Sequence, residues 1–173
     1  MIDIANREYG HLPRLEFINE SIAEFSKNRP NIKFDVAISN MSLITIPNLE
    51  RAIKAISLVV SLGGVFAFSI THPCFYNQYR KYQSADIFQY HVPHVQKGRL
   101  IISSDPKGLP VPTRHFHRPL QEYFRNLRAA SFVIDELVEP FPDSTTEKLY
   151  PTPWKVPHFL FVRCIKLSAI QPN

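Results

Sequence analysis

Two polar positions follow directly on strand-like apolar runs, and their residue types could do chemistry. Asn40 and Met41 come after the run Phe34–Ser39, and His72 follows the run Val65–Ser69. In open α/β sheets, ligands bind beyond the carboxyl ends of the strands. A histidine there could orient a substrate or take its proton, because its ordinary pKa of about 6.5 lies near neutral pH. We therefore predict a site at Asn40, Met41 and His72, although Asn40 could merely turn the chain and His72 could be a plain loop residue.

Four other histidines, His91, His94, His115 and His117, have spacings that can chelate a metal ion. Metal sites in proteins often combine histidine with carboxylate or thiolate ligands. No acid or cysteine lies close by in the sequence to complete such a set. We expect no metal site, and we interpret these histidines as solvent-facing or as part of a substrate pocket.

An aromatic segment precedes these histidines and contains Phe75, Tyr76, Tyr79, Tyr82, Phe88 and Tyr90. An apolar and aromatic lining with a few polar tips suits a small organic ligand. The alternative is a helix that packs Phe75, Tyr79 and Tyr82 on the core. The sequence favours neither interpretation over the other.

The N-terminal part of the chain predicts a helix and then a strand. Ile2, Ala5 and Tyr9 share one helical face, and Gly10 is expected to end that helix. Residues 15–18 are expected to form a short strand.

A strand–helix–strand unit follows. Asn48 can cap a helix whose apolar stripe faces a sheet, and the pair Gly63-Gly64 is expected to end it. Residues 34–39 and 65–69 are the flanking strands. The second is apolar on both faces, so we expect helices on both sides of it. This order favours a parallel sheet with a right-handed crossover.

The C-terminal part predicts one helix and a strand pair. Leu120–Ala130 has an apolar face, with Pro119 in the first helical turn. Residues 132–138 and 159–166 are two strands that could pair antiparallel, and residues 100–103 could form another short strand. The fold class predicted from these elements is α/β.

Length and charge limit the classes of function. The chain has 173 residues, of which 45% are hydrophobic and 20% charged, as in one globular domain. The formal net charge is +5, but the lysines and arginines are scattered singly and form no basic run. We therefore expect no nucleic-acid partner.

The cysteines and the N-terminus bear on cellular location. Cys74 and Cys164 stand far apart, which favours a reducing, cytoplasmic setting without disulfides. The N-terminal residues mix acids with apolar residues and form no signal peptide. The most apolar stretch, residues 55–70, is too short to span a bilayer. We expect a cytoplasmic protein that does not enter a membrane.

Motifs across residues 34–138 carry a family resemblance. In order they are Phe34-Asp-Val-Ala-Ile-Ser-Asn-Met-Ser-Leu, Ile46-Pro-Asn-Leu-Glu, Gly63-Gly-Val-Phe-Ala-Phe-Ser-Ile-Thr-His-Pro-Cys-Phe, His117-Arg-Pro-Leu-Gln-Glu-Tyr and Leu127-Arg-Ala-Ala-Ser-Phe-Val-Ile. Together they resemble the class I S-adenosylmethionine-dependent methyltransferases of type 11 or 12. The resemblance implies a Rossmann-like, doubly wound, mainly parallel sheet that ends in an antiparallel strand pair.

The resemblance covers the C-terminal two-thirds of that family's domain. The family's first two strands and its Gly-x-Gly-x-Gly cofactor loop have no counterpart in these 173 residues. We therefore expect a single, N-terminally truncated domain over residues 1–173 that binds its cofactor poorly. The strand at residues 34–39 would then present a free edge, which could pair with a second chain or a second copy.

The resemblance implies S-adenosylmethionine as cofactor and methyl transfer to a small-molecule acceptor as activity. It places Glu20, Ser21 and Ile22 beside the adenine, where an ordinary polar loop is the alternative. It places Asn40 and Met41 around the sulfonium.

The resemblance also implies an acceptor-binding cover at about residues 71–113. Within or beside it, Tyr76, Tyr79, His115 and His117 would bind the acceptor, and His72 would be catalytic. Nothing in the sequence identifies the acceptor. The alternative function is a noncatalytic remnant that acts by pairing with another chain at the exposed sheet edge.

Overall fold

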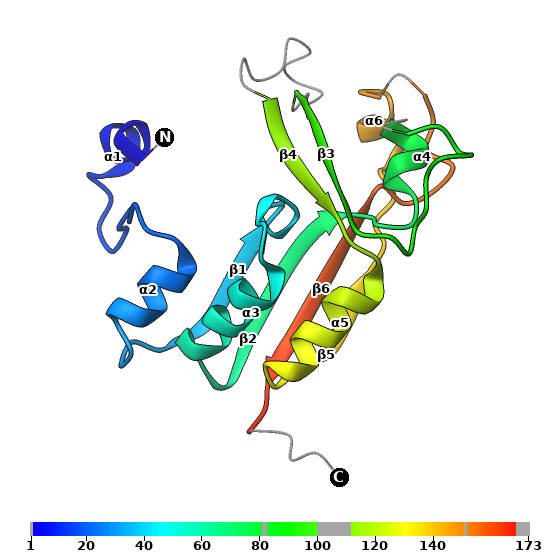
Figure 1. Ribbon diagram of the computed structural model, residues 1–173. Coiled ribbons are helices and arrows are strands. Elements are labelled where there is room, and N and C mark those ends of the chain that lie inside the picture. Colours follow the sequence, from blue (N-terminus) through cyan, green and yellow to red (C-terminus); the bar gives the residue numbers. More distant parts are fainter. Residues whose placement is uncertain (1, 81–82, 100–111, 151, 169–173) are drawn as a thin grey trace.

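The structure is a computed structural model that describes residues 2–80, 83–99, 112–150 and 152–168. Its helices are α1 (Ile2–Tyr9), α2 (Ile22–Asn28), α3 (Leu49–Val59), α4 (Tyr76–Arg80), α5 (Leu120–Ala129) and α6 (Ser144–Glu147), with a 3-10 turn η1 (Leu43–Thr45). Its strands are β1 (Phe34–Asn40), β2 (Val60–Thr71), β3 (His94–Arg99), β4 (Pro112–His117), β5 (Phe132–Val138) and β6 (Phe159–Lys166), shown in Figure 1.

The main sheet has the strand order β1-β2-β6-β5. Strands β1 and β2 are parallel, with Asn40 opposite Ser69, and β6 runs antiparallel to both β2 and β5. Thus β1, β2 and β5 point in one direction, and β5 and β6 form the predicted antiparallel pair. The α/β fold class is confirmed, and the bounds of β5 and β6 equal the predicted ones.

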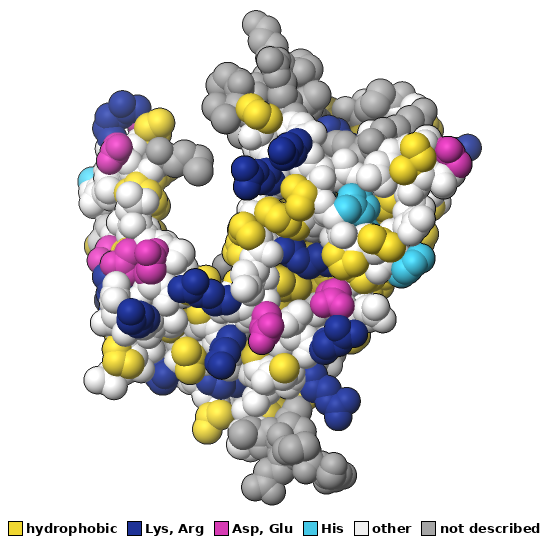
Figure 2. Space-filling model, viewed as in Figure 1, with side chains coloured by type: hydrophobic (Ala, Val, Ile, Leu, Met, Phe, Trp, Pro, Cys, Tyr) yellow, Lys and Arg dark blue, Asp and Glu magenta, His cyan; other side chains and the backbone are white. Residues whose placement is uncertain are grey.

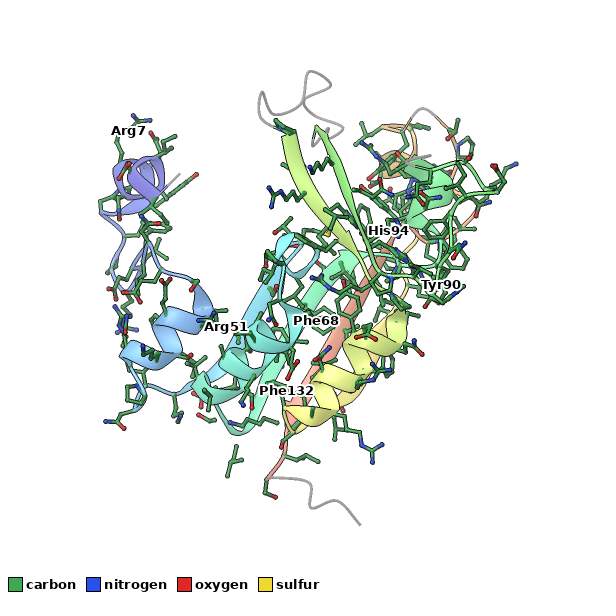
Figure 3. All side chains as sticks on the ribbon, in the orientation of Figure 1. Arg7, Arg51, Phe68, Tyr90, His94 and Phe132 are labelled. Atoms are coloured by element: carbon green, nitrogen blue, oxygen red, sulfur yellow. The ribbon has the colours of Figure 1, made fainter. Side chains whose placement is uncertain are left out.

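Helices α3 and α5 lie on the same face of this sheet (Figure 1). Asn48 caps α3 as predicted, because its Oδ1 accepts the Arg51 N–H at 2.8 Å. Phe68 and Phe132 lie between the sheet and these helices (Figure 3). The core on this side also contains Leu49, Ile53, Ile56, Phe66, Ile70, Tyr123, Leu127, Leu160 and Val162. Burial of this apolar layer is the main term that stabilises the packing of the helices on the sheet.

The opposite face of the sheet is uncovered over β1. Val36 is 54% exposed and Ile38 is 77% exposed. The prediction that helices lie on both sides of residues 65–69 is therefore wrong for the described part of the chain, where α3 and α5 share one side. The apolar run indicates a strand whose two faces can both be buried, but it does not indicate which elements cover them.

The pair Gly63-Gly64 lies inside β2, so the prediction that it ends the helix is wrong. The register between β1 and β2 shifts nearby, between Phe34 and Val36. Gly63 has a φ of 75°, and a Cβ at Gly64 would lie 2.9 Å from the Asp35 carbonyl oxygen. The glycines therefore accommodate a strand irregularity and a close backbone approach.

The N-terminal segment contains the predicted α1, and the Gly10 N–H closes its last turn on Asn6 O at 2.8 Å. No residue of α1 is buried, and a notch in the surface lies between this helix and strands β3 and β4 (Figure 2). The prediction of a strand at residues 15–18 is wrong, because this segment pairs with no described strand. Helix α2, which packs beside α3, was not predicted from the sequence.

A separate antiparallel ribbon of β3 and β4 projects beyond the carboxyl ends of β1 and β2 (Figure 1). The short helix α4 lies at the same end of the molecule. Both elements fall in or beside the segment 71–113 that was expected to cover a site. The strand predicted at residues 100–103 lies outside the described residues.

Candidate functional site

Asn40 and Met41 lie at the carboxyl end of β1, next to the end of β2. Ser69 Oγ donates to Asn40 Oδ1 at 2.5 Å and accepts the Met41 N–H at 3.1 Å. Met41 has a φ of 53°, in the left-handed region that few residues other than glycine adopt. Ser69 therefore holds the turn after β1 in place, while Asn40 stays exposed and accessible to a ligand.

Arg118, which lies just before α5, stabilises the next turn, η1. Its side chain is 8% exposed, and its guanidinium donates to the carbonyl oxygens of Leu43, Ile46 and Pro47 at 3.3, 2.5 and 2.9 Å. These bonds tie η1 to the start of α5. Arg118 belongs to the motif His117-Arg-Pro-Leu-Gln-Glu-Tyr, but this role was not predicted for it.

A hollow of about 440 Å³ opens on the uncovered sheet face beside Asn40. Apolar side chains such as Ile38 and Phe161 form much of its lining. Glu136 and Arg163, opposite each other on β5 and β6, also line it and form an ion pair at 3.0 Å. A hollow of this size with a few polar groups can hold a small organic ligand.

His72 follows β2 and is 2% exposed. Its Nδ1 accepts the Cys74 N–H at 3.2 Å, so its Nε2 carries the proton and donates it to Glu139 Oε1 at 2.7 Å. The Tyr76 N–H donates to the His72 carbonyl oxygen at 2.9 Å, which joins His72 to α4. Both ring nitrogens are engaged, so His72 could act as a base only after releasing the Cys74 amide.

The structure brings Tyr76 and His115 together. Their rings are within 10° of parallel and their centroids are 5.6 Å apart. His115 Nε2 lies 3.4 Å from Thr71 Oγ1, at the end of β2, and His117 Nε2 lies 2.8 Å from the Tyr90 carbonyl oxygen. Burial lowers the pKa of His115 to about 4 and also lowers the pKa of His117. Both imidazoles are therefore neutral at neutral pH.

Tyr79 contacts a histidine that the sequence analysis missed. Its ring stacks on one face of His158 at 3.7 Å, and Trp154 stacks on the other face at 3.6 Å. His158 is 3% exposed, and burial lowers its pKa to about 4. The His158 carbonyl oxygen accepts the His72 N–H at 2.8 Å, so this stack supports the loop after β2.

The residues expected beside the adenine have contacts within the α2 region. Glu20 pairs with Arg29 at 2.7 Å. Ser21 caps α2 in a reciprocal capping box with Glu24, a Ser-x-x-Glu pattern that could have revealed the helix. Ile22 packs against the main core.

No group of three or more histidine, cysteine, aspartate or glutamate side chains in the described ranges is placed to hold a metal ion. No helix in the same ranges is long and apolar enough to cross a membrane.

Solved structures show which fold this arrangement belongs to. A protein from Listeria monocytogenes, provisionally assigned as an S-adenosylmethionine-dependent methyltransferase, matches with a TM-score of 0.68 and 18% identity, over 94% of this chain and 74% of its own. Another such methyltransferase, from Mesorhizobium loti, matches with a TM-score of 0.63 and 19% identity, over 95% of this chain and 76% of its own. The fold is that of the class I methyltransferases.

The methyltransferase fold is shared with an N-methyltransferase from Bradyrhizobium japonicum that was solved in complex with S-adenosyl-L-homocysteine. Its TM-score is 0.55 and its identity 11%, over 96% of this chain and 62% of its own. No protein-family model and no curated protein matches the sequence. The fold predicted from the motifs is confirmed, and within it Asn40, Met41 and His72 follow the ends of two adjacent parallel strands.

Proposed function

We propose that this chain acts in S-adenosylmethionine-dependent methyl transfer to a small-molecule acceptor. The observation that carries the proposal is the position of Asn40, Met41 and His72 at the carboxyl ends of adjacent parallel strands of a methyltransferase fold. Ligands of open α/β sheets bind at this place. The ring pair of Tyr76 and His115 lies beside the end of β2 and offers a wall for the acceptor.

The residues at the end of β1 fit one side of the cofactor. Asn40 is exposed and its side-chain oxygen is held by Ser69, while the half-buried Met41 packs against the core next to it. The bound cofactor would supply an electrophilic methyl group on its sulfonium. In this proposal Asn40 and Met41 border the sulfonium of the cofactor. Ile22 supports the adenine from the core side, and Ser21 lies at the edge of the adenine site. Glu20 would reach the adenine by exchanging its ion pair with Arg29.

The protein's contribution to the reaction would be proximity and orientation. Tyr76 comes from α4 and His115 from the ribbon, and their stacked rings would form one wall of the acceptor site. Tyr79, stacked on His158, and His117, bonded to the Tyr90 carbonyl oxygen, would support this wall from behind. His72 fixes this arrangement through the Tyr76 N–H, and it could take a proton if the Cys74 amide moved away.

We infer that this chain binds the cofactor weakly. The 173 residues contain no Gly-x-Gly-x-Gly run, and that loop lets the backbone approach the cofactor in such folds. Contacts at the end of β1 would then supply most of the binding free energy.

Calorimetric titration with S-adenosylhomocysteine tests the proposal. We expect Asn40→Ala to weaken binding by about tenfold, the cost of one lost hydrogen bond. Asn28→Ala, at the exposed end of α2, is the matched control and should bind like the unmodified chain. Equal affinities for all three proteins would contradict the assignment of Asn40. Micromolar binding by the unmodified chain would contradict the inference of weak binding.

A second candidate function is pairing with another chain at the edge of β1. In the described sheet β1 pairs with β2 alone, so its other edge is free. Val36 and Ile38 on this strand are exposed apolar side chains. A free strand edge beside an apolar face is a template for association with a second chain, including a second copy.

We expect Ile38→Lys to weaken self-association by about tenfold or more, because a charge replaces an apolar contact. Sedimentation velocity at increasing protein concentration measures this. Leu149→Lys is the control, since Leu149 is 70% exposed and lies far from β1 in the sequence. A monomer at all concentrations, or equal effects of both substitutions, would rule out pairing at this edge.

A further inference from the structure

One face of the β3–β4 ribbon carries four nitrogen-bearing side chains. His94 lies directly opposite His117, and Gln96 lies directly opposite His115. Because side chains alternate along a strand, these two pairs share one face. The rings of His94 and His117 stack at 4.7 Å, and His94 lies on the side of the ribbon toward Tyr90 (Figure 3).

This face closes over a small cavity of about 20 Å³. Its lining also includes Thr71 at the end of β2, Tyr76 and Asn77 of α4, and Phe88. A cavity of this volume holds one water-sized group.

Two buried polar atoms at this cavity have no hydrogen-bond partner among the described residues: His94 Nε2 and Gln96 Nε2. His94 Nδ1 lies 2.9 Å from the Val92 carbonyl oxygen and must donate to it. In the neutral ring Nε2 is therefore an acceptor, while the Gln96 amide nitrogen is a donor. The cavity thus offers one acceptor and one donor within a water-sized space.

Among the residues that the structure describes, the lining contains no lysine, arginine, aspartate or glutamate. A charged ligand group would lose its hydration here without gaining a counter-charge, which is unfavourable. A carboxylate would also lack a proton to donate to His94, and an ammonium group would lack a lone pair to accept from Gln96. A neutral hydroxyl both donates and accepts.

We propose that this cavity is a binding subsite for a neutral hydroxyl group, which donates to His94 Nε2 and accepts from the Gln96 amide. A cleft of about 700 Å³ adjoins it, because Asn77 and Phe88 line both. The cleft is large enough for the body of a small organic molecule. The subsite would determine which acceptor is methylated, and the acceptor would then be a neutral alcohol or phenol. This part of the inference rests on the proposed function.

The test uses phenol as probe and follows the imidazole nitrogens of the ¹⁵N-labelled full chain by NMR, without S-adenosylmethionine. We expect saturable shifts of the His94 nitrogens with phenol, and binding at least about tenfold weaker for anisole, benzoate and benzylammonium. Gln96→Leu should weaken phenol binding by about tenfold. Lys97→Gln, at an exposed position on the other face of the ribbon, should leave it unchanged.

Binding of phenol and benzoate with equal affinity, or no shift of His94 at saturating phenol, would overturn the proposal. Circular dichroism shows whether Gln96→Leu is folded, and the comparison of phenol with anisole tests the proposal on the unmodified chain. Because cofactor is left out, failure of methyl transfer leaves this result unaffected. A separate methyl-transfer assay with phenol decides whether the bound hydroxyl is the acceptor.

Discussion

Replacing Arg118 by methionine is expected to lower the free energy of unfolding by about 4 kcal/mol. The Arg118 guanidinium donates to three carbonyl oxygens around η1, and this arginine is only 8% exposed. Hydrogen bonds to charged groups contribute about 1.5–3 kcal/mol each, and methionine would leave these acceptors without the donor. The turn that carries Met41 would loosen together with the fold.

Urea denaturation followed by circular dichroism measures this loss. Arg118→Lys should be intermediate, because an ammonium group cannot reproduce the planar fork of donors. Arg125→Met is the control, since that arginine side chain is 66% exposed in a surface ion pair and should change stability little. An Arg118→Met protein as stable as the control would show that these bonds contribute nothing net.

The stability of the protein is expected to fall steeply as the pH drops from 6.5 to 4, and His158 should supply about 3 kcal/mol of that loss. Burial between Tyr79 and Trp154 lowers the pKa of His158 to about 4 in the folded state, from an ordinary 6.5. In this pH range the unfolded chain binds a proton that the folded chain does not. Stability is therefore full above pH 6.5 and is lost as the pH falls toward 4. His115 acts in the same direction.

His158→Phe isolates this contribution, because phenylalanine can stack between the same two rings but cannot be protonated. Denaturation at a series of pH values should give a shallower pH dependence for His158→Phe than for the unmodified chain. His11→Phe, at an exposed position, should keep the original dependence. Identical slopes for the His158→Phe and unmodified proteins would show that His158 is protonated equally in both states.

Local patterns predicted much of the scaffold. Asn48 caps α3 as expected, and both C-terminal strands have their predicted bounds. The pattern of each element lies within its own residues. For the helix it is a capping residue before an apolar stripe, and for the strands it is a run of apolar residues. Residues 15–18 have the composition of a strand, but a strand exists only when a neighbour supplies hydrogen bonds. The pair Gly63-Gly64 could equally end a helix or accommodate a strand irregularity.

The location of the candidate site could be predicted from the sequence, but most of the contacts within it could not. The positions of Asn40 and His72 follow from the general rule for parallel strands. The bond between His72 and Glu139 joins residues 67 apart in sequence. The stack of Tyr79 on His158 and the bonds of Arg118 to the turn after β1 are also long-range contacts. No local pattern encodes such pairs, because they arise only when separate elements pack.

The most direct test of the central claim is a ¹H–¹⁵N NMR titration of this chain with S-adenosylhomocysteine, which detects even weak binding and shows where it occurs. We expect saturable shifts of the backbone amides of Asn40, Met41 and Ser69 at the ends of β1 and β2. No shift at any concentration, or shifts confined to residues away from these strand ends, would contradict the assignment of this site to methyl transfer.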